Sequence, residues 1–338
     1  MNSEDVKAVK RLLSEPQKIV IVPHKNPDGD AIGSTLGLCH YLNKLGHDAT
    51  VVSPNDFPQF LKWMPGSELI VNFEKDNSLA LKLITGATII CTLDFNHLSR
   101  IGQMQQSLEA SRADFIMIDH HQAPADYALI TYSDVSMSST CEMVYNFIEA
   151  LGGRGSITPE IANCLYAGIM TDTGSFKFSS TTSRTHRVIA ALIDQGADNT
   201  QVHHNIYDSN SSDRVRLLGC ALGNMVLLKE YNTAYITLSQ EELDAHNYKK
   251  GDTEGFVNYG LTVEGIKFAV IFIENKEEGI IKISFRSFGE FSVNDFARAH
   301  YSGGGHINAA GGRSESSLEA TTEKFKELLK QYKDQLTS

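Results

Sequence analysis

Aspartate and histidine residues gather in four short segments, which are His24-Lys25-Asn26-Pro27-Asp28-Gly29-Asp30, Asp94, Asp119-His120-His121 and Thr171-Asp172-Thr173-Gly174. If these segments meet in one site, their carboxylates repel one another unless cations neutralise them. Two divalent cations supply four positive charges, and mixed imidazole and carboxylate ligands suit Mn²⁺, Fe²⁺, Co²⁺ or Zn²⁺ better than Mg²⁺ or Ca²⁺. Two such ions about 3.5–4 Å apart can share a hydroxide and align it against a phosphorus atom. The residue types therefore predict hydrolysis of a phosphate ester.

Each segment also has an ordinary interpretation. A single aspartate after a strand is usually a helix cap or a turn residue, and a pair of histidines lies more often on the surface than in a metal site. Four such segments at successive element ends are poorly explained by chance. Taken together they favour a metal site.

The elements that must position these residues are predicted by hydrophobic patterning in the first half of the chain. Continuous apolar runs predict strands buried on both faces, and helical spacing predicts the segments between them. We expect strands at 18–23, 49–53, 87–93 and 114–118, and helices at 30–45, 139–151, 159–170 and 184–194. This alternation predicts an α/β domain with a mainly parallel sheet flanked by helices. Three of the segments follow strands, and the carboxyl ends of parallel strands lie along one edge of the sheet, where ligands of such folds bind. Asp172 follows a helix, and we expect it to lie at the same edge.

The second half of the chain has a different sequence pattern. A helix with two glycines is expected at 211–228, followed by strands at 233–238, 266–273 and 280–285, a glycine-rich stretch at 302–312 and a helix at 318–336. The pattern predicts an α/β domain over residues 1–195, a helical linker over 196–228, and a smaller α/β domain over 229–338.

Composition excludes several classes of protein. The formal charge is −11, from 30 basic and 41 acidic residues, whereas proteins that grip long duplex nucleic acid are usually basic. The five cysteines lack CxxC spacing, which argues against a disulfide framework and a structural zinc site. The polar N-terminus lacks a signal-peptide core, and no run of about 18 apolar residues exists. We expect a cytoplasmic protein with no membrane partner.

Five motifs resemble those of the DHH phosphoesterase family. They are HKNPDGDAIGS (His24–Ser34), LDFNHLSRIG (Leu93–Gly102), the triplet Asp119-His120-His121, TDTGSF (Thr171–Phe176) and GGGHINAAGG (Gly303–Gly312). The last is similar to the signature of the DHH-associated C-terminal domain. The resemblance extends over nearly the whole chain and implies a catalytic metal-binding domain followed by a substrate-binding domain.

The resemblance also implies roles for individual residues. One metal would be held by His24, Asp28 and Asp94, and the other by Asp30, Asp94, His120 and Asp172, with Asp94 shared. His121 would face the scissile phosphate, while Asp119 would either orient a neighbouring histidine or touch a metal through water. Substrate binding would fall to Arg286, Gly303, Gly304, Gly305 and His306, with Arg100 as a further phosphate ligand. The glycines would let backbone N–H groups approach an anion, with a helix starting just after them.

Family members with this two-domain form are similar to nano-RNases that also remove a phosphate from 3′-phosphoadenosine 5′-phosphate. The resemblance thus implies a manganese-dependent 3′-5′ oligoribonuclease and nucleotide phosphatase that uses two metal ions. Its substrates would be short oligoribonucleotides, or mononucleotides and dinucleotides. The first alternative is hydrolysis of cyclic di-AMP or linear pApA by the same chemistry. A second, of another class, is a non-catalytic nucleotide-binding regulatory protein. The sequence leaves open whether the protein forms a homodimer.

Overall fold

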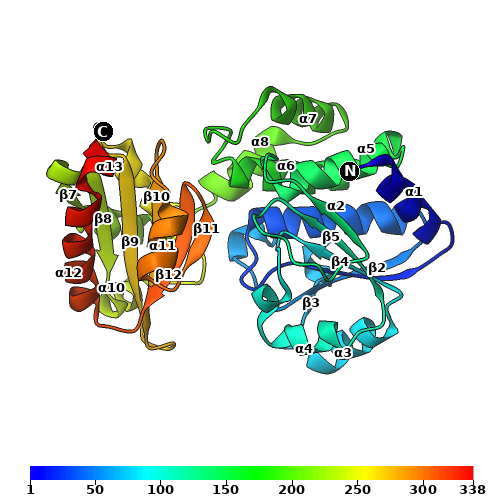
Figure 1. Ribbon diagram of the computed structural model, residues 1–338, viewed down its shortest axis with the longest axis horizontal. Helices are drawn as coiled ribbons and strands as arrows, with labels where there is room; N and C mark the ends of the chain where they lie inside the picture. The colour runs from blue at the N-terminus through cyan, green and yellow to red at the C-terminus, as the bar shows by residue number, and fades with distance from the viewer. Residues whose placement is uncertain (338) are drawn as a thin grey trace. The chain divides into compact units, whose positions relative to one another are not determined.

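The computed structural model describes residues 1–337 and divides the chain into two compact units. The first is Met1–Ser209, and the second begins at Asn210. Figure 1 colours the first unit from blue to green and the second from yellow-green to red. Within the described residues, no helix is both long enough and apolar enough to cross a lipid bilayer.

The first unit is built on a six-stranded sheet in which every neighbouring pair is parallel. Its strand order is β3-β2-β1-β4-β5-β6. The strands are β1 (Lys18–Val22), β2 (Asp48–Ser53), β3 (Val71–Asn72), β4 (Ile89–Leu93), β5 (Asp114–Asp119) and β6 (Ile130–Ser133). The predicted parallel α/β domain is therefore confirmed.

Helices cover both faces of this sheet (Figure 1). They are α1 (Ser3–Leu12), α2 (Gly29–Lys44), α3 (Asn77–Gly86), α4 (Gln105–Glu109), α5 (Thr140–Ala150), α6 (Pro159–Asp172), α7 (Ser183–Asp194) and α8 (Asn199–His203). Alternate residues of β1 enter different cores, because side chains alternate across a strand. Ile19 and Ile21 join the core that includes α2, α5 and α6, while Val20 and Val22 join the core beneath α3 and α4. Both faces are covered, so β1 is apolar from Ile19 to Val22.

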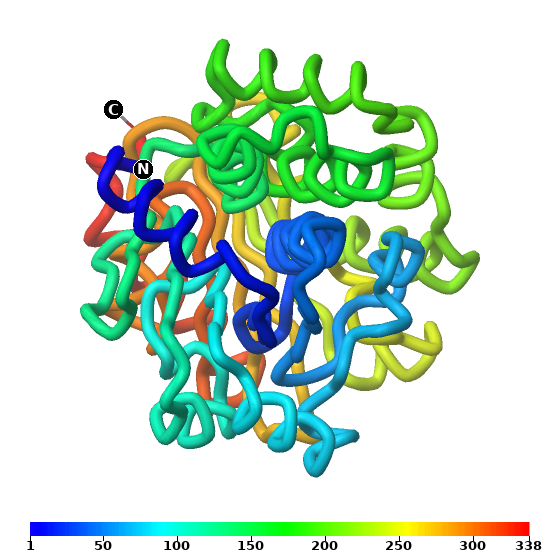
Figure 2. The backbone as a smooth tube through the Cα atoms, turned by 90° about the vertical axis from the view of Figure 1, so that its right-hand side faces the viewer, coloured from blue at the N-terminus to red at the C-terminus, as the bar shows by residue number. Residues whose placement is uncertain are grey.

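Helices α2 and α6 pack closely, as the blue and green segments of Figure 2 show. Glycines permit this approach. A Cβ atom on Gly33 would lie 2.5 Å from the carbonyl oxygen of Cys164, and one on Gly168 would overlap the Cys141 sulfur. The close packing matters for the site, because α2 carries Asp30 near its first residue and α6 ends at Asp172.

The second unit has a mixed sheet in the order β11-β12-β10-β9-β8-β7. The strands are β7 (Val226–Leu228), β8 (Thr233–Leu238), β9 (Phe268–Asn275), β10 (Ile280–Ser287), β11 (Gly304–His306) and β12 (Ala309–Ser314). The helices are α9 (Ser212–Gly223), α10 (Gln240–Ala245), α11 (Val293–His300), α12 (Leu318–Leu329) and α13 (Lys333–Thr337). One face packs on α11 and α12, and the other packs on α9 and α10.

Three predicted elements differ from the structure. The helix expected to reach Leu228 ends at Gly223. The side-chain amide of Asn224 donates to Thr237 O at 2.9 Å, and the chain then joins the sheet as β7. The helix expected after the glycines is wrong as well, since Gly304–Ser314 forms the hairpin β11–β12. The expected C-terminal helix divides into α12, a short 3₁₀ segment and α13.

We expect Gly33→Ala to destabilise the first unit by about 1–3 kcal/mol, because the added methyl group must push α2 away from the α6 backbone. Gly86→Ala is the matched control, since a Cβ atom there meets nothing within 4 Å. Chemical denaturation monitored by circular dichroism measures both. Equal stability of the two variants would contradict the tight α2–α6 contact.

Candidate metal centre

The first group of potential ligands lies after β1 and β4. His24 directs Nε2 toward two carboxylates, at 3.8 Å from Asp28 Oδ2 and 3.6 Å from Asp94 Oδ2. Potential donor atoms of these residues all lie within 4.8 Å of one another. His24 and Asp94 are buried, while the Asp28 side chain is 59% exposed. The group is thus open to solvent on the side of Asp28.

The second group lies beside the first. His120 Nε2 is 3.8 Å from Asp30 Oδ2, 3.6 Å from Asp172 Oδ2 and 3.5 Å from Asp94 Oδ1. Asp94 therefore turns one oxygen toward each histidine. Asp30 lies in the first turn of α2, His120 directly follows β5, and Asp172 is the last residue of α6. This is the arrangement that a ligand shared between two cations would need.

The two buried histidines are oriented in the same way. Nδ1 of His24 lies 2.9 Å from Lys25 O, and Nδ1 of His120 lies 3.3 Å from Met137 O. A carbonyl oxygen only accepts hydrogen bonds, so Nδ1 is the donor in both rings. In the neutral form of each ring, Nε2 carries the lone pair and faces the carboxylates, as in histidines that bind metals.

The N-terminus of α5 holds two of the carboxylates. Asp30 accepts from the backbone N–H groups of Thr140, at 2.6 Å, and Cys141, at 2.9 Å, while the Thr140 hydroxyl donates to Asp94 Oδ1 at 3.0 Å. The unpaired amides of a helix N-terminus stabilise negative charge. Sequence reasoning missed Thr140, because Ser139-Thr140 reads locally as an ordinary helix start.

Asp28 has two roles at once. Its Oδ1 accepts from the N–H groups of Asp30 and Ala31 at 3.0 and 3.1 Å and so caps α2, while Oδ2 faces His24. The helix-cap interpretation and the metal-ligand interpretation are therefore compatible. The cap fixes the direction of the carboxylate.

His121 and Asp119 form a third group with Asp94 at the end of β5, where His121 Nδ1 lies 3.7 Å from Asp94 Oδ1. Nδ1 of His121 lies 2.7 Å from Asp119 Oδ1, so the carboxylate orients this histidine. The other Asp119 oxygen is buried, and no hydrogen bond to it is found among the described residues. Of the two roles expected for Asp119, this geometry favours the orientation of a neighbouring histidine.

The loop that carries His24 is fixed by its neighbours. Asn26 has a left-handed backbone (φ 55°) and exchanges two hydrogen bonds of 2.7 Å with Asn55, a residue that sequence reasoning missed. The N–H of Lys25 donates to the carbonyl of Arg100 at 2.8 Å. Arg100 itself is exposed. Asp94 is also left-handed (φ 65°), a conformation that aspartate tolerates better than most residues.

The electrostatics of the cluster match a site built for cations. Burial, with the charges of Asp94 and Asp172, raises the pKa of Asp30 well above its ordinary value. Burial likewise raises the pKa of Asp172 to about 6. Burial alone would lower the pKa of His24, but hydrogen bonds to Asp28 and Asp94 raise it to about 10. Without cations, protons must therefore compensate the clustered negative charge.

The residues present fit divalent cations. Two groups of imidazole and carboxylate donors share Asp94, and both histidines turn Nε2 inward. A buried Asp119 oxygen has no hydrogen-bond partner in the described part of the chain. Mixed nitrogen and oxygen donors of this kind suit first-row transition metals.

The predicted substrate residues of the second unit lie on adjacent strands. Arg286 is on β10, opposite Ala309 of β12, and His306 ends β11. Cβ atoms on Gly303 and Gly305 would overlap the carbonyls of Gly311 and Ala309. The two amides are also used internally, since Gly303 N donates to Ala297 O at 3.2 Å and Gly305 N to Asn294 Oδ1 at 2.9 Å. These glycines therefore close the hairpin.

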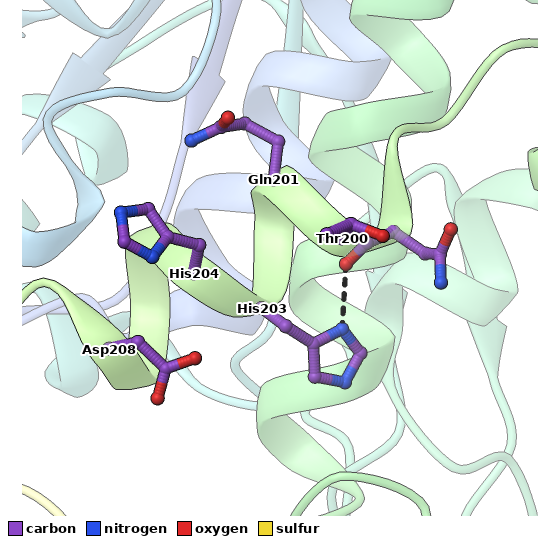
Figure 3. A pocket seen from close by; sticks show the side chains of 6 residues that line it. Thr200, Gln201, His203, His204 and Asp208 are labelled. Carbon is purple, nitrogen blue, oxygen red and sulfur yellow. Dashed lines mark hydrogen bonds between the residues drawn. The ribbon is translucent and has the colours of Figure 1, made fainter.

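A polar pocket of about 580 Å³ lies elsewhere in the first unit and is lined by Asn199, Thr200, Gln201, His203, His204 and Asp208. Figure 3 shows the His203 ring held by the hydrogen bond of 2.7 Å between its Nδ1 and Asn199 O. Its Nε2 lies 3.4 Å from the Ser175 hydroxyl, in the turn after α6. The pocket contains none of the predicted ligands, and His203 has a structural role.

Comparison with known proteins defines the class of this chain. Residues 18–169 match the N-terminal domain of the DHH family, and residues 230–338 match the DHHA1 domain. The chain belongs to the DHH family of phosphoesterases and is a hydrolase of that family.

Particular relatives are similar over nearly the full length. The bifunctional oligoribonuclease and PAP phosphatase NrnA of Thermus thermophilus is 33% identical over 89% of this chain and 87% of its own. A crystal structure of an exopolyphosphatase-related protein from Bacteroides fragilis is 41% identical, with a TM-score of 0.95 over 100% of this chain and 98% of that one. The cyclic-di-AMP phosphodiesterase GdpP of Bacillus subtilis is 27% identical over 96% of this chain but only 49% of its own.

We expect Thr140→Val to weaken binding of Mn²⁺ by about tenfold or more, because an isosteric side chain without a hydroxyl leaves Asp94 without its supporting hydrogen bond. Thr140→Ser retains the hydroxyl and is the control. Isothermal titration calorimetry measures the affinity, and thermal unfolding of the cation-free protein checks the fold. Wild-type affinity in Thr140→Val would show that the hydroxyl does not support the site.

Proposed function

We propose that this protein is a manganese-dependent phosphoesterase that hydrolyses oligoribonucleotides of a few residues from the 3′ end and removes a phosphate from 3′-phosphoadenosine 5′-phosphate. The observation that carries the proposal is the Asp94 carboxylate, whose two oxygens face two separate groups of histidine and aspartate donors. The similarity to a bifunctional oligoribonuclease and PAP phosphatase over most of both chains supports the same substrates.

In this proposal His24, Asp28 and Asp94 hold one cation, and Asp30, Asp94, His120 and Asp172 hold the second. Bound divalent cations supply Lewis acidity, which generates a water nucleophile at neutral pH and offsets charge on the phosphoryl oxygens. The α5 amides keep the Asp30 carboxylate in place, and the Thr140 hydroxyl does the same for the shared Asp94 carboxylate.

His121 handles the proton of the leaving group. Because Asp119 accepts the hydrogen bond from Nδ1, any proton that passes to the departing oxygen must leave from Nε2. The buried Asp119 carboxylate stabilises the charged form of the ring before the proton is transferred.

In the second unit, the guanidinium of Arg286 suits a bidentate contact to a substrate phosphate, and His306 adds a further donor. Exposed Arg100 is a third phosphate ligand in this proposal.

We propose that residues 1–195 form the catalytic domain, residues 196–228 the linker and residues 229–338 the substrate-binding domain. The family matches at 18–169 and 230–338 support the two outer parts. We also propose that the protein works in the cytoplasm on short substrates and does not bind long duplexes.

A side-by-side turnover assay tests the proposed substrates. We expect purified protein with Mn²⁺ to hydrolyse di- to pentaribonucleotides and 3′-phosphoadenosine 5′-phosphate at least about tenfold faster, as kcat/KM, than cyclic di-AMP. Chelation with EDTA should stop turnover, and added Mn²⁺ should restore it. Fastest turnover of cyclic di-AMP or pApA would favour the GdpP-like alternative. Tight binding of these nucleotides without hydrolysis would favour the regulatory protein.

We expect Asp94→Asn to lower kcat at least about 1000-fold, because the amide cannot supply two anionic oxygens to neighbouring cations. Asp114→Asn is the control, since Asp114 is exposed at the opposite end of β5. Kinetics and Mn²⁺ stoichiometry are measured on both variants. Near-wild-type rates in Asp94→Asn would show that the site is assigned to the wrong residues.

A further inference from the structure

Two apolar side chains of the second unit are exposed beside the residues proposed to bind substrate. Phe288 is 75% exposed and Ile307 is 49% exposed, whereas Phe268, Phe285 and Phe296 are all buried in the core. Single exposed apolar residues are common on protein surfaces. What distinguishes this pair is its position in the sheet.

Backbone hydrogen bonds hold Phe288 in place just beyond the end of β10. Ser287 N donates to Asn308 O at 3.1 Å, and Phe288 N donates to Lys267 O at 2.8 Å. Both bonds keep the register in which Arg286 lies opposite Ala309 and Ala269. Ile307 precedes Asn308 in the turn between β11 and β12. Asn308 hydrogen-bonds to Ser287 and Gly289, the two residues that flank Phe288, so the turn that carries Ile307 lies beside Phe288.

Phe288 lies on the same face of the strand as Arg286. Side chains alternate along a strand, and the neighbours Phe285 and Ser287 are buried on the α11 side. Arg286 and Phe288 therefore project from the opposite face. Their Cα atoms are about 7 Å apart, a span that one nucleotide covers between its phosphate and its base.

The turn that presents Phe288 is rigid. The Asn308 amide donates to Ser287 Oγ at 2.8 Å and to Gly289 O at 2.9 Å, and Ser287 Oγ donates to Phe291 O at 2.7 Å. Gly289 adopts the left-handed conformation (φ 84°) that the turn requires. An exposed ring on a fixed turn loses little conformational freedom when a ligand covers it.

We propose that Phe288, flanked by Ile307, is the platform on which a nucleobase of the substrate stacks while Arg286 holds the adjacent phosphate. The inference deepens the proposed function and rests on its nucleotide substrate. A phenyl ring beside an aliphatic side chain offers a flat apolar surface without hydrogen-bonding groups, so it accepts any base. The guanidinium of Arg286 next to it complements the charge of a phosphate. An apolar surface for a base beside a cation for a phosphate favours a nucleotide as the ligand.

Fluorescence of a dinucleotide that contains 2-aminopurine tests the platform without turnover, because stacking quenches this base. The full-length protein is titrated in EDTA. We expect quenching with wild-type protein, and a loss of quenching with at least about a tenfold weaker Kd for Phe288→Ala. Phe288→Trp should restore quenching, while Phe288→Leu should not. Quenching by Phe288→Ala at wild-type affinity would overturn the proposal.

Kinetics with Mn²⁺ provide the second readout. Phe288→Ala should raise KM for a triribonucleotide about tenfold with kcat within twofold, and should leave KM for an analogue without bases unchanged. Leu227→Ala is the control, because Leu227 is also exposed but lies on β7 at the opposite edge of the sheet. An equal increase of KM for the analogue without bases would overturn base stacking.

The outcomes separate the platform from the enzyme activity. If wild-type protein quenches the fluorescent base but hydrolyses no short nucleotide, the proposed function fails and the platform stands. If wild-type protein hydrolyses them and Phe288→Ala has the same KM, only the platform fails. A change of molar mass in Phe288→Ala by light scattering, with unchanged KM and quenching, would assign the surface to a second copy of this chain.

Discussion

Repulsion among carboxylates is the constraint on which the first unit depends. A parallel sheet brings the ends of β1, β4 and β5 to one edge, and these ends carry Asp94, Asp119 and the turn that begins α2. Negative charge concentrated in this way needs compensation. The chain supplies it with imidazoles, with the amides of α5 and with one threonine hydroxyl. Two divalent cations would complete the balance.

Helix ends supply much of that compensation. Asp28 caps α2, and the N-terminus of α5 points its amides at Asp30. The partial positive charge of a helix N-terminus favours an anion there, so the helices that build the fold also fix the direction of the ligands. Close packing through Gly33 and Gly168 keeps α2 and α6 at the separation that the site needs. Stability and function are therefore coupled in this unit.

The sequence predicted the parts of the fold that have a strong local pattern. The four apolar runs became β1, β2, β4 and β5, because the central residues of strands buried on both faces are mainly apolar. The residues that came together at the sheet edge were also those predicted. Thr140 and Asn55 could not be predicted, since each acts across more than 25 residues of sequence while resembling a common cap or turn residue. Glycine-rich β11 offered no hydrophobic pattern, and its role as a strand is set by the steric limits of the hairpin.

Those steric limits bear on how the second unit recognises a substrate. Glycine-rich loops often bind anions through backbone amides, but the amides of Gly303 and Gly305 already donate within the unit. Their lack of side chains instead allows β11 to lie against β12. In the function proposed for this chain, recognition of a phosphate in this unit then falls to side chains, above all Arg286 on β10. The glycines contribute indirectly, because the hairpin they close is the support for His306 and Ile307 beside that strand.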